Sequence, residues 1–576
     1  MRNRNTENGA LRLSRRGFVA GTFAAGALVG AGALAACSPE KPGGQQSAGT
    51  GRDASGQAGA DDWLGVAPEI PASEIASTLE TDLLIVGAGN GGLVAAATAA
   101  QEGMDFLLAE KNSVVCETRI WVGAVNSHYT KEAGIEVDPQ RVLFELSRYA
   151  SYKCDQEVIK VWINESAKLI DWLDEVHGPE YFLDTAMTPD SPYYIPELQH
   201  MYKSENGLPT AFPGMSDPPL MRNEALEKLI VDAGHEILFE HRLVKLLRED
   251  GGAVTGGVFE TTAGYVQINA KNTLLTTGGY ADNRVMMETL NPVVPRCCTA
   301  NSFNPGNDGS GQRAALHIGA QRDPEATAMI FDRGAVPPGM AAGYVGDAFP
   351  GPIMQFMFGS QPFLKVDQDG RRFANESTPY DFITHAASLR RNGTYVQVFD
   401  RNCLADSMRF QTVGCSKIGP FILAMSEGDP DAAFAAEMEA GAVVKAESIE
   451  ELAEKLQLPV DTFTATVERY NELFDKGVDE DFGKEAFRLS AIKEPPFYGV
   501  TLGGSLLTTI DGLTITPDME VKDTEGNVIP SLYAAGDCSG SFFSGNYPEL
   551  IIGVAVARTM TFARHAVLHI AGKSVL

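Results

Sequence analysis

A glycine-rich turn near residue 90 has the spacing of a phosphate-binding loop. Gly87, Gly89 and Gly92 follow the apolar run 81–86 and precede an alanine-rich stretch, 93–102. The first glycine permits a tight turn, the second lets a pyrophosphate approach the backbone, and the third allows close helix-to-strand packing. We therefore expect a buried strand, a turn and a helix whose N-terminus binds the phosphates of a dinucleotide.

The residues after this helix strengthen the prediction. Residues 105–109 form a second apolar run, which ends at Glu110. An acidic residue at this point is placed to accept hydrogen bonds from a ribose. The glycine pattern alone is weak evidence, but the strand, helix, second strand and acidic end occur in the expected order, which argues against a merely tight turn.

Two later segments repeat the strand-to-glycine form. Residues 272–277 precede Gly278, and 529–535 precede Gly536 and Asp537; a helix is expected over 550–571. Together with the first motif, these segments resemble the FAD domain of the fumarate reductase and succinate dehydrogenase flavoprotein family, over roughly residues 80–576. The segment 370–376 is similar to that family's Gly-x-Arg-Phe-x-Asn-Glu sequence, and 304–306 to its His-Pro-Gly turn.

The resemblance implies FAD as cofactor and assigns residues to it. Glu110 would hold the adenosine ribose and Asp537 the ribityl chain, while Ile552 and Gly553 would face the flavin ring. The full set of implied FAD contacts is Gly87, Ala88, Gly89, Gly91, Gly92, Glu110, Lys111, Gly123, Ala124, Val244, Thr277, Gly278, Asp537, Ile552 and Gly553.

The resemblance also implies the domain organisation. The fold class is α/β, a Rossmann-like FAD-binding domain with an inserted α+β capping domain. The FAD domain would comprise residues 80–305 and 496–576, and the capping domain 306–495. Helical apolar spacing predicts helices over 156–176 and 449–476. The tryptophans of the first of these helices are interpreted as core.

The chain departs from the family where fumarate reductases bind a dicarboxylate with His and Arg side chains. The turn histidine corresponds to Asn304, the proton-donating Arg to Gly359, a second His to Val500 or Gly499, and the last Arg to Tyr547. Two carboxylates need charge-assisted donors. We therefore expect a substrate other than a dicarboxylate.

Tyr547 and Pro548 resemble the Tyr-Pro of flavin-dependent 3-ketosteroid dehydrogenases, in which the tyrosine hydrogen-bonds a ketone oxygen. A phenol is a neutral donor suited to a carbonyl oxygen that gains charge; packing on the flavin is the simpler role. Candidate catalytic residues are Tyr547, Tyr344 as a second proton donor, Asn304 and Arg333, although a salt-bridged Arg333 is the plainer interpretation. An apolar cap surface would be lined by Phe331, Met354, Phe356, Met357 and Phe358, and His128 is a weaker candidate beside the flavin edge.

The N-terminal segment resembles a targeting signal. Residues 14–19, with Arg15 and Arg16, resemble a twin-arginine export signal, and 34–37 resemble a lipobox whose Cys37 would carry a lipid anchor. The alternative is a transmembrane anchor, but glycine and alanine dominate the segment. Residues 1–37 would be signal and lipobox and 38–79 a flexible linker and lead-in, so we expect a protein on the extracytoplasmic face of the membrane.

Composition limits the partners. The chain has 576 residues, 44% of them hydrophobic, and a formal net charge of −29. This charge opposes nucleic acid as a partner. Eight cysteines without a Cys-x-x-Cys pair predict neither a haem attachment site nor a ribbon-type zinc site, and no spacing supports an iron–sulfur cluster. Electrons would therefore come from an external donor, such as a membrane-bound cytochrome.

These expectations favour one function among several. The first is FAD-dependent reduction of an activated C=C bond in a small neutral α,β-unsaturated carbonyl or aryl-alkene compound, used as an electron acceptor in anaerobic respiration. The alternatives are a 3-ketosteroid-type dehydrogenase, a fumarate- or urocanate-like enoate reductase with a changed pocket, and a lipid-anchored binding protein without catalysis.

Overall fold

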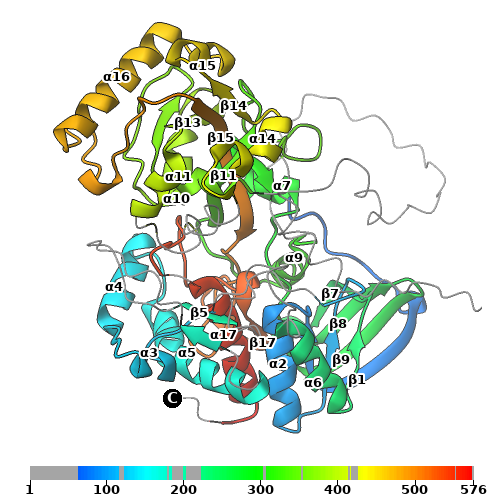
Figure 1. Ribbon diagram of the computed structural model, residues 1–576. Helices are drawn as coiled ribbons and strands as arrows, with labels where there is room; N and C mark the ends of the chain where they lie inside the picture. The colour runs from blue at the N-terminus through cyan, green and yellow to red at the C-terminus, as the bar shows by residue number, and fades with distance from the viewer. Residues whose placement is uncertain are drawn as a thin grey trace, which may run out of the picture.

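The computed structural model describes residues 63–115, 122–177, 181–183, 199–202, 222–301, 306–351, 355–410, 412, 416, 426–551 and 553–573. These residues form two bodies, a lower one that holds both ends of the described chain and an upper one between them (Figure 1). The predicted export signal and Cys37 lie outside the described residues. No helix of the described part is long and apolar enough to cross a membrane.

The lower body is built on an eight-stranded sheet whose path is β16-β17-β9-β1-β2-β6, with β8 on β9 and β7 on β8. The strands β17, β9, β1, β2 and β6 run parallel. The strands span Ile75–Val86 (β1), Phe106–Ala109 (β2), Ile237–Leu238 (β6), Arg242–Arg248 (β7), Val254–Thr261 (β8), Gly264–Leu275 (β9), Glu520–Lys522 (β16) and Val528–Ala534 (β17). Parallel order about β1 is the arrangement that brings the carboxyl ends of these strands to one edge.

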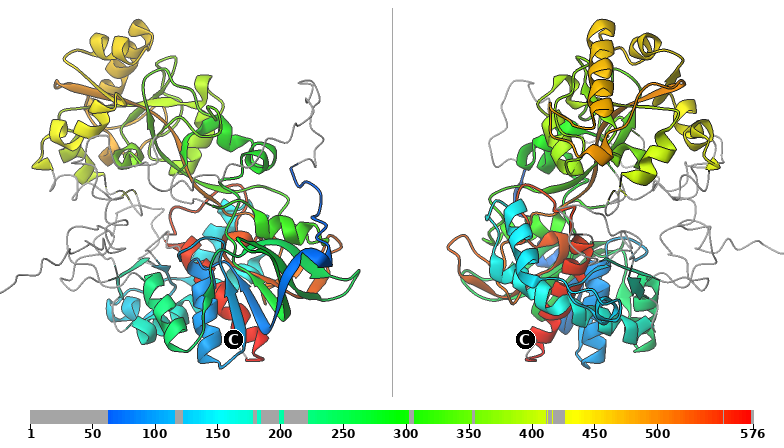
Figure 2. Two further views of the ribbon diagram at one scale, coloured as in Figure 1. Left: turned by 90° about the vertical axis from the view of Figure 1, so that its right-hand side faces the viewer. Right: turned by 60° about the vertical axis from the view of Figure 1, so that its left-hand side comes forward.

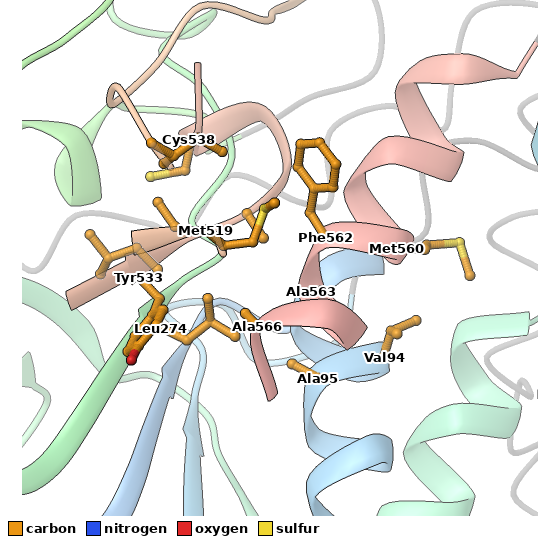
Figure 3. Packing of buried hydrophobic residues seen from close by; sticks show 14 of the residues in the cluster. Val94, Ala95, Leu274, Met519, Tyr533, Cys538, Met560, Phe562, Ala563 and Ala566 are labelled. Carbon is orange, nitrogen blue, oxygen red and sulfur yellow. The ribbon is translucent and has the colours of Figure 1, made fainter. Parts of the chain in front are cut away.

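Helices cover this sheet. Those of the lower body are α2 (Asn90–Gln101), α3 (His128–Glu132), α4 (Pro139–Tyr149), α5 (Gln156–His177), α6 (Arg222–Asp232), α9 (Ser310–Leu316) and α17 (Val554–Ile570). The buried faces of α2 and α17 meet, with Val94 and Ala95 facing Met560, Ala563 and Ala566 across the interface (Figure 3). Small residues on α2 let the two helices approach, so the last helix of the chain lies beside the first. A small sheet of β3 (Val122–Gly123), β5 (Gln199–Tyr202) and β4 (Tyr181–Leu183) lies in the same body.

The upper body is built on a second, six-stranded sheet, in which β10, β11, β13 and β14 all pair with β15. Its strands are β10 (Cys298–Asn301), β11 (Ala328–Val336), β12 (Leu364–Asp367), β13 (Tyr395–Asp400), β14 (Val443–Ala446) and β15 (Phe497–Thr509). Its helices are α10 (Tyr380–Ala387), α11 (Cys403–Arg409), α13 (Pro430–Ala433), α14 (Ala435–Glu439), α15 (Ile449–Lys455) and α16 (Val460–Lys476), while α7 (Arg284–Leu290) and α8 (Val293–Cys297) lead into it.

The chain passes between the bodies at points that differ from the predicted boundaries. Strand β10 already pairs with β15 of the upper sheet, and the helix that follows it, α9, contacts β7 of the lower body, so the chain returns there after residue 306. On the way back, the first half of β15 pairs with β13 and β14 of the upper sheet, so the chain leaves that body only after residue 502. The two further views show the same two bodies, with the upper body formed by segments between two parts of the lower one (Figure 2).

Several predicted elements agree with the structure and one differs. Helix α5 begins at Gln156 as expected, and Trp162 and Trp172 are buried in the core, which confirms their interpretation. The helix expected over 449–476 is two helices, because Pro459 caps the second one after a break. A proline removes a backbone donor and disfavours a helical residue before it, so one continuous helix cannot form here.

Candidate active site

The glycine-rich turn forms as predicted and leaves room for phosphate. Gly87 has φ +104°, and a Cβ there would lie 2.6 Å from the Thr276 carbonyl oxygen. A Cβ on Gly92 would lie 1.7 Å from the Gly87 oxygen, whereas one on Gly89 would meet nothing within 4 Å. The first and third glycines therefore allow close packing, and the second leaves an open approach to the N-terminus of α2.

Glu110, at the end of β2, fixes the shape of this turn. Its buried carboxylate accepts hydrogen bonds from the Ala88 backbone N–H at 2.7 Å and from the Asn112 backbone and side-chain nitrogens, each at 2.8 Å. Oε1 accepts both bonds from Asn112, whereas Oε2 accepts only the bond from Ala88 and has a second lone pair for a ribose hydroxyl at the cavity wall.

A cavity runs along the carboxyl ends of β1, β2, β9 and β17. Its wall includes Gly87, Gly89, Gly91, Glu110, Lys111, Thr277, Gly278 and Asp537 of the predicted set, together with His241, Leu243, Ser310 and Thr559. Val244, which was predicted to contact the cofactor, is not among these lining residues. Alternate residues of a strand point to opposite faces, and it is the neighbouring Leu243 that faces the cavity.

Lys111 and Asp537 are held in place at this cavity. The Lys111 ammonium donates to the Gly306 carbonyl and forms an ion pair with Asp308 at 3.2 Å. The Asp537 carboxylate accepts from the Thr508 hydroxyl at 3.0 Å and from the Arg558 guanidinium at 3.3 Å. Both side chains are thereby pre-positioned rather than loose in solvent.

The predicted flavin end of the site joins two distant segments. The Gly123 N–H donates to the Gly553 carbonyl at 3.0 Å, and a Cβ on Gly553 would lie 2.5 Å from the Gly123 nitrogen. Gly553 caps α17 with φ +75°, and Ala124 beside Gly123 is buried. The positive end of a 17-residue helix dipole therefore lies at this contact. Ile552 lies outside the described residues.

Tyr547 is held by helix α10 of the upper body. Its backbone N–H donates to the Asp381 carboxylate at 3.0 Å, and its ring is nearly parallel to that of Tyr380, with centroids 6.4 Å apart. Burial raises the pKa of Asp381 well above its usual range. The side chain of Tyr547 is 6% exposed, so it lies in the interface between the two bodies rather than on the surface.

A second cavity, of about 400 Å³, adjoins this tyrosine cluster. Tyr380, Glu549 and Leu550 form part of its wall, with Tyr149 of α4 and Asp332 and Ser360 of the upper body. Among the described lining residues, four carboxyl groups (Asp332, Glu376, Glu485, Glu549) face two guanidinium groups (Arg148, Arg488).

The positions that the sequence resemblance matches to the cations of fumarate reductases are closely packed. A Cβ on Gly359 would lie 2.4 Å from the Asp332 carbonyl oxygen, so that no side chain fits there. Val500 is fully buried in the aromatic core of the upper body, and a Cβ on Gly499 would lie 2.6 Å from Leu456. At these positions the packing leaves no room for a larger side chain.

Two further catalytic candidates, Arg333 and Tyr344, have packing contacts of their own. The Arg333 guanidinium is buried, donates to Ser360 at 2.7 Å and to Gln355 at 3.1 Å, and does not line the second cavity. Tyr344 stacks on Phe349 at 4.2 Å in a cluster separate from that of Tyr547, so the structure does not bring the two tyrosines together.

The apolar surface expected in the cap is mostly core. Phe356 and Phe358 are buried among the aromatic residues of the upper body, and the Met357 sulfur accepts from Arg333. Phe331 instead packs edge-on against Tyr380, with centroids 4.7 Å apart, and so supports the tyrosine cluster. Asn304 and Met354 lie outside the described residues.

His128 forms surface ion pairs. Its two ring nitrogens lie 2.8 Å from Asp171 and 3.2 Å from Asp174, and more than a third of the side chain is exposed. Stabilisation of α3 against α5 accounts for this histidine without a role in catalysis.

Sequence reasoning missed α10 and Glu549. Helix α10 supplies Tyr380 and Asp381, and the side chain of His385 hydrogen-bonds that of Asn546, next to Tyr547. The one available signal was the position of Glu549 two residues after Tyr547. The residues of α10 lie far from it in the chain and have no motif of their own.

A parallel sheet with a glycine-rich turn, an acidic residue at the end of β2 and an open approach to α2 defines a dinucleotide-binding flavoprotein. The chain matches the family described as "FAD binding domain" over residues 82–550 and belongs to it. The space over Gly89 and the carboxylate of Glu110 fit the pyrophosphate and ribose of FAD. FAD is thus the cofactor, and the protein is an FAD-dependent oxidoreductase.

Comparison with known proteins finds two reductases that are similar in sequence and a solved structure that is similar in fold. The chain is 30% identical to the vinyl phenol reductase of Lactiplantibacillus plantarum over 513 residues, which cover 86% of this chain and 98% of that protein. It is 24% identical to the fumarate reductase (cytochrome) of Shewanella frigidimarina over 494 residues, 84% of this chain and 76% of that one. The structure of 3-ketosteroid Δ1-dehydrogenase from Sterolibacterium denitrificans has a TM-score of 0.67 at 19% identity, covering 86% of this chain and 99% of that one, which is a likeness of fold.

Proposed function

We propose that this protein is a reductase of an activated carbon–carbon double bond in a neutral α,β-unsaturated carbonyl or aryl-alkene compound. The observation that carries the proposal is a buried phenol, Tyr547, at the place where the fumarate reductases have an arginine. Closure of the space at Gly359 and Val500 supports it, because a dicarboxylate would find no cation there. The name of the relative at 30% identity, a vinyl phenol reductase, fits an aryl-alkene substrate.

Several residues of the chain would bind the cofactor and orient it for the reaction. Bound FAD, when reduced, supplies a hydride to one carbon of the double bond. Glu110, Lys111 and the turn at Gly89 would hold the nucleotide part of the cofactor, and Asp537 the ribityl chain. The N-terminus of α17, capped by Gly553, would stabilise negative charge at the ring.

Tyr547 would donate a hydrogen bond to the carbonyl oxygen of an α,β-unsaturated substrate. Negative charge develops on that oxygen when the hydride reaches the β-carbon, and a fixed donor in a dry site stabilises it. Asp381 and Tyr380 orient Tyr547 through its backbone N–H and its ring. The interface between the two bodies would exclude water from the reacting atoms.

We further propose that the protein is exported as a lipid-anchored flavoprotein through residues 1–37 and receives electrons from a membrane-bound donor. The twin-arginine pattern and Cys37 support the export, and the acidic body supports docking on a basic donor surface. Radiolabelled palmitate incorporation into wild-type protein, and its loss in Cys37→Ala, tests the anchor.

An anaerobic assay with reduced methyl viologen tests the reaction. Dye oxidation by enones or vinyl phenols, with slow turnover of fumarate and urocanate, is the expected result. Dye reduction by saturated ketones would favour the dehydrogenase direction instead, and a protein purified without flavin absorbance would contradict both. Tyr395→Phe is a matched control for Tyr547→Phe, because Tyr395 is buried in the upper body with a hydroxyl that has no hydrogen-bond partner among the described residues.

A further inference from the structure

Reduction of a double bond needs a proton as well as a hydride. In the fumarate reductases an arginine supplies it, but the corresponding residue here is Gly359, whose Cβ position is blocked by the Asp332 carbonyl oxygen at 2.4 Å. Another acid must therefore reach the same space. Ser360, the next residue, lines the second cavity, so that cavity opens beside this position in the chain.

We propose that Glu549 is the acid that protonates the substrate carbon next to the one that receives the hydride. This inference rests on the function proposed above and names the proton donor of that same site. Glu549 lines the second cavity with Ser360, Asp332 and Tyr380, and lies two residues after Tyr547. The proposed donor to the oxygen and the proposed donor to the carbon thus come from one short segment.

The carboxyl group of Glu549 is held in a fixed orientation by the upper body. One oxygen accepts from the Tyr380 backbone N–H at 3.1 Å, and the other accepts from the Ser416 hydroxyl at 2.9 Å. Neither partner is a charged group. The protonated acid keeps both of these bonds and still has its own O–H to donate into the cavity.

The other three carboxyl groups of the cavity wall are paired with cations. Glu376 forms an ion pair with Arg372 at 2.9 Å, Asp332 lies 3.7 Å from Lys365, and Glu485 lies 3.8 Å from Arg488. An ion pair favours the charged form of an acid. Glu549 forms no ion pair with any residue of the described chain, so it is the carboxyl group best able to carry a proton.

The charges around Glu549 also favour its neutral form. The titratable groups that act on Glu549 or respond to its charge are Asp332 and Arg333 of β11, Asp381 of α10, Tyr149 of α4 and Arg488. Burial, followed by the charge of Asp332, raises the pKa of Glu549 to about 7, against the opposing effect of Arg333. About half of the molecules therefore carry the proton at neutral pH, which suits a general acid.

The hydride, the proton and the electrons of this step all have a source among the groups already named. The π bond of the substrate breaks, one new C–H bond forms with the hydride from the reduced cofactor, and the other forms with the proton of Glu549. Glu549 is left as a carboxylate and takes up a proton from water through the second cavity. The two electrons come from the external donor, which is reduced viologen in the assay.

The test compares Glu549→Gln with Glu549→Asp and with a control, Glu165→Gln, in the flavin-loaded protein. Glu165 is a buried carboxylate 3.0 Å from His565, away from both cavities, so its substitution reports the general cost of losing a buried carboxylate. We expect Glu549→Gln to lower kcat by about 10²- to 10⁴-fold with little change in KM, and Glu549→Asp to restore part of the rate.

The pH profile and infrared spectra distinguish an acid from a packing residue. In wild-type protein kcat should fall as the pH rises through about 7, and Glu549→Gln should lack this limb. Infrared difference spectra across neutral pH should contain a carboxylic-acid band that only Glu549→Gln loses. Wild-type rates and an unchanged pH limb in Glu549→Gln, or no such band in wild-type protein, would overturn the proposal. A wild-type protein that reduces none of the unsaturated compounds would instead refute the proposed function and, with it, this inference.

Discussion

The open space over Gly89 allows cofactor binding to be removed without unfolding the protein. The backbone at Gly89 has φ −87° and ψ −163°, an extended conformation that any residue can adopt. A Cβ at this position meets nothing within 4 Å, so the isopropyl group of Gly89→Val would occupy only the volume intended for the pyrophosphate. Folding should lose no more than about 1 kcal/mol, the scale of an N-cap change.

The expected loss of FAD affinity is much larger. The side chain would prevent the phosphates from reaching the N–H groups at the start of α2. A hydrogen bond to a charged group contributes about 1.5–3 kcal/mol, so the loss of two weakens binding by about 3–6 kcal/mol. This corresponds to an increase in Kd of about 10²- to 10⁴-fold.

Flavin absorbance of the purified protein and calorimetric titration of apoprotein with FAD would measure this effect, with circular dichroism to report folding. Gly92→Ala is the contrasting variant, because its Cβ would lie 1.7 Å from the Gly87 oxygen and should disturb folding itself. Gly89→Val with the FAD affinity of wild-type protein would refute the assignment of this turn. Gly92→Ala with wild-type thermal stability would refute the packing argument.

Three further predictions concern the site and the upper body. Tyr547→Phe should lower kcat/KM by about 10²- to 10³-fold with unchanged flavin content in the viologen assay, whereas an unchanged rate would leave the ring a packing role only. Arg372→Met should lower the free energy of unfolding by about 3–5 kcal/mol in urea denaturation, because the buried Glu376 and Asp479 carboxylates would lose their shared partner. The raised pKa of Glu549, about 7 against 4.5, contributes about 3 kcal/mol of stability that is complete below pH 4.5 and lost as the pH rises through 7; Glu549→Gln should flatten this part of the stability profile, and parallel profiles would contradict it.

The nucleotide half of the site was predictable because short-range geometry determines it. The strand, turn and helix at 81–102 are contiguous, and each glycine has a local reason for its place. The position of Glu110 could be predicted because one helix of ordinary length connects the turn to the strand that ends at Glu110. The same logic failed at Val244, where the prediction depended on which face of β7 meets the cavity, and a shift of one residue along a strand reverses the face.

The substrate half was less predictable because tertiary contacts assemble it. Tyr547 could be identified from a dipeptide, but its partners Tyr380 and Asp381 lie more than 160 residues earlier in the chain. Tyr344 was a candidate because it lies in a glycine-rich loop, yet its ring packs on Phe349 in a separate cluster. Residue type and loop position do not encode distance between side chains.

The charges that hold the upper body together are paired with one another, and of this network only Glu376 lines the second cavity. Arg372 and Glu376, from the segment that resembles the family's Gly-x-Arg-Phe-x-Asn-Glu sequence, form a buried network with Asp479 and Lys484 rather than a ligand for substrate. The sequence resemblance matches the substrate-binding cations of fumarate reductases to other positions, such as Gly359 and Tyr547. A change at those positions leaves the network intact, so the fold can keep its cap while the pocket changes the charge of the molecule it accepts.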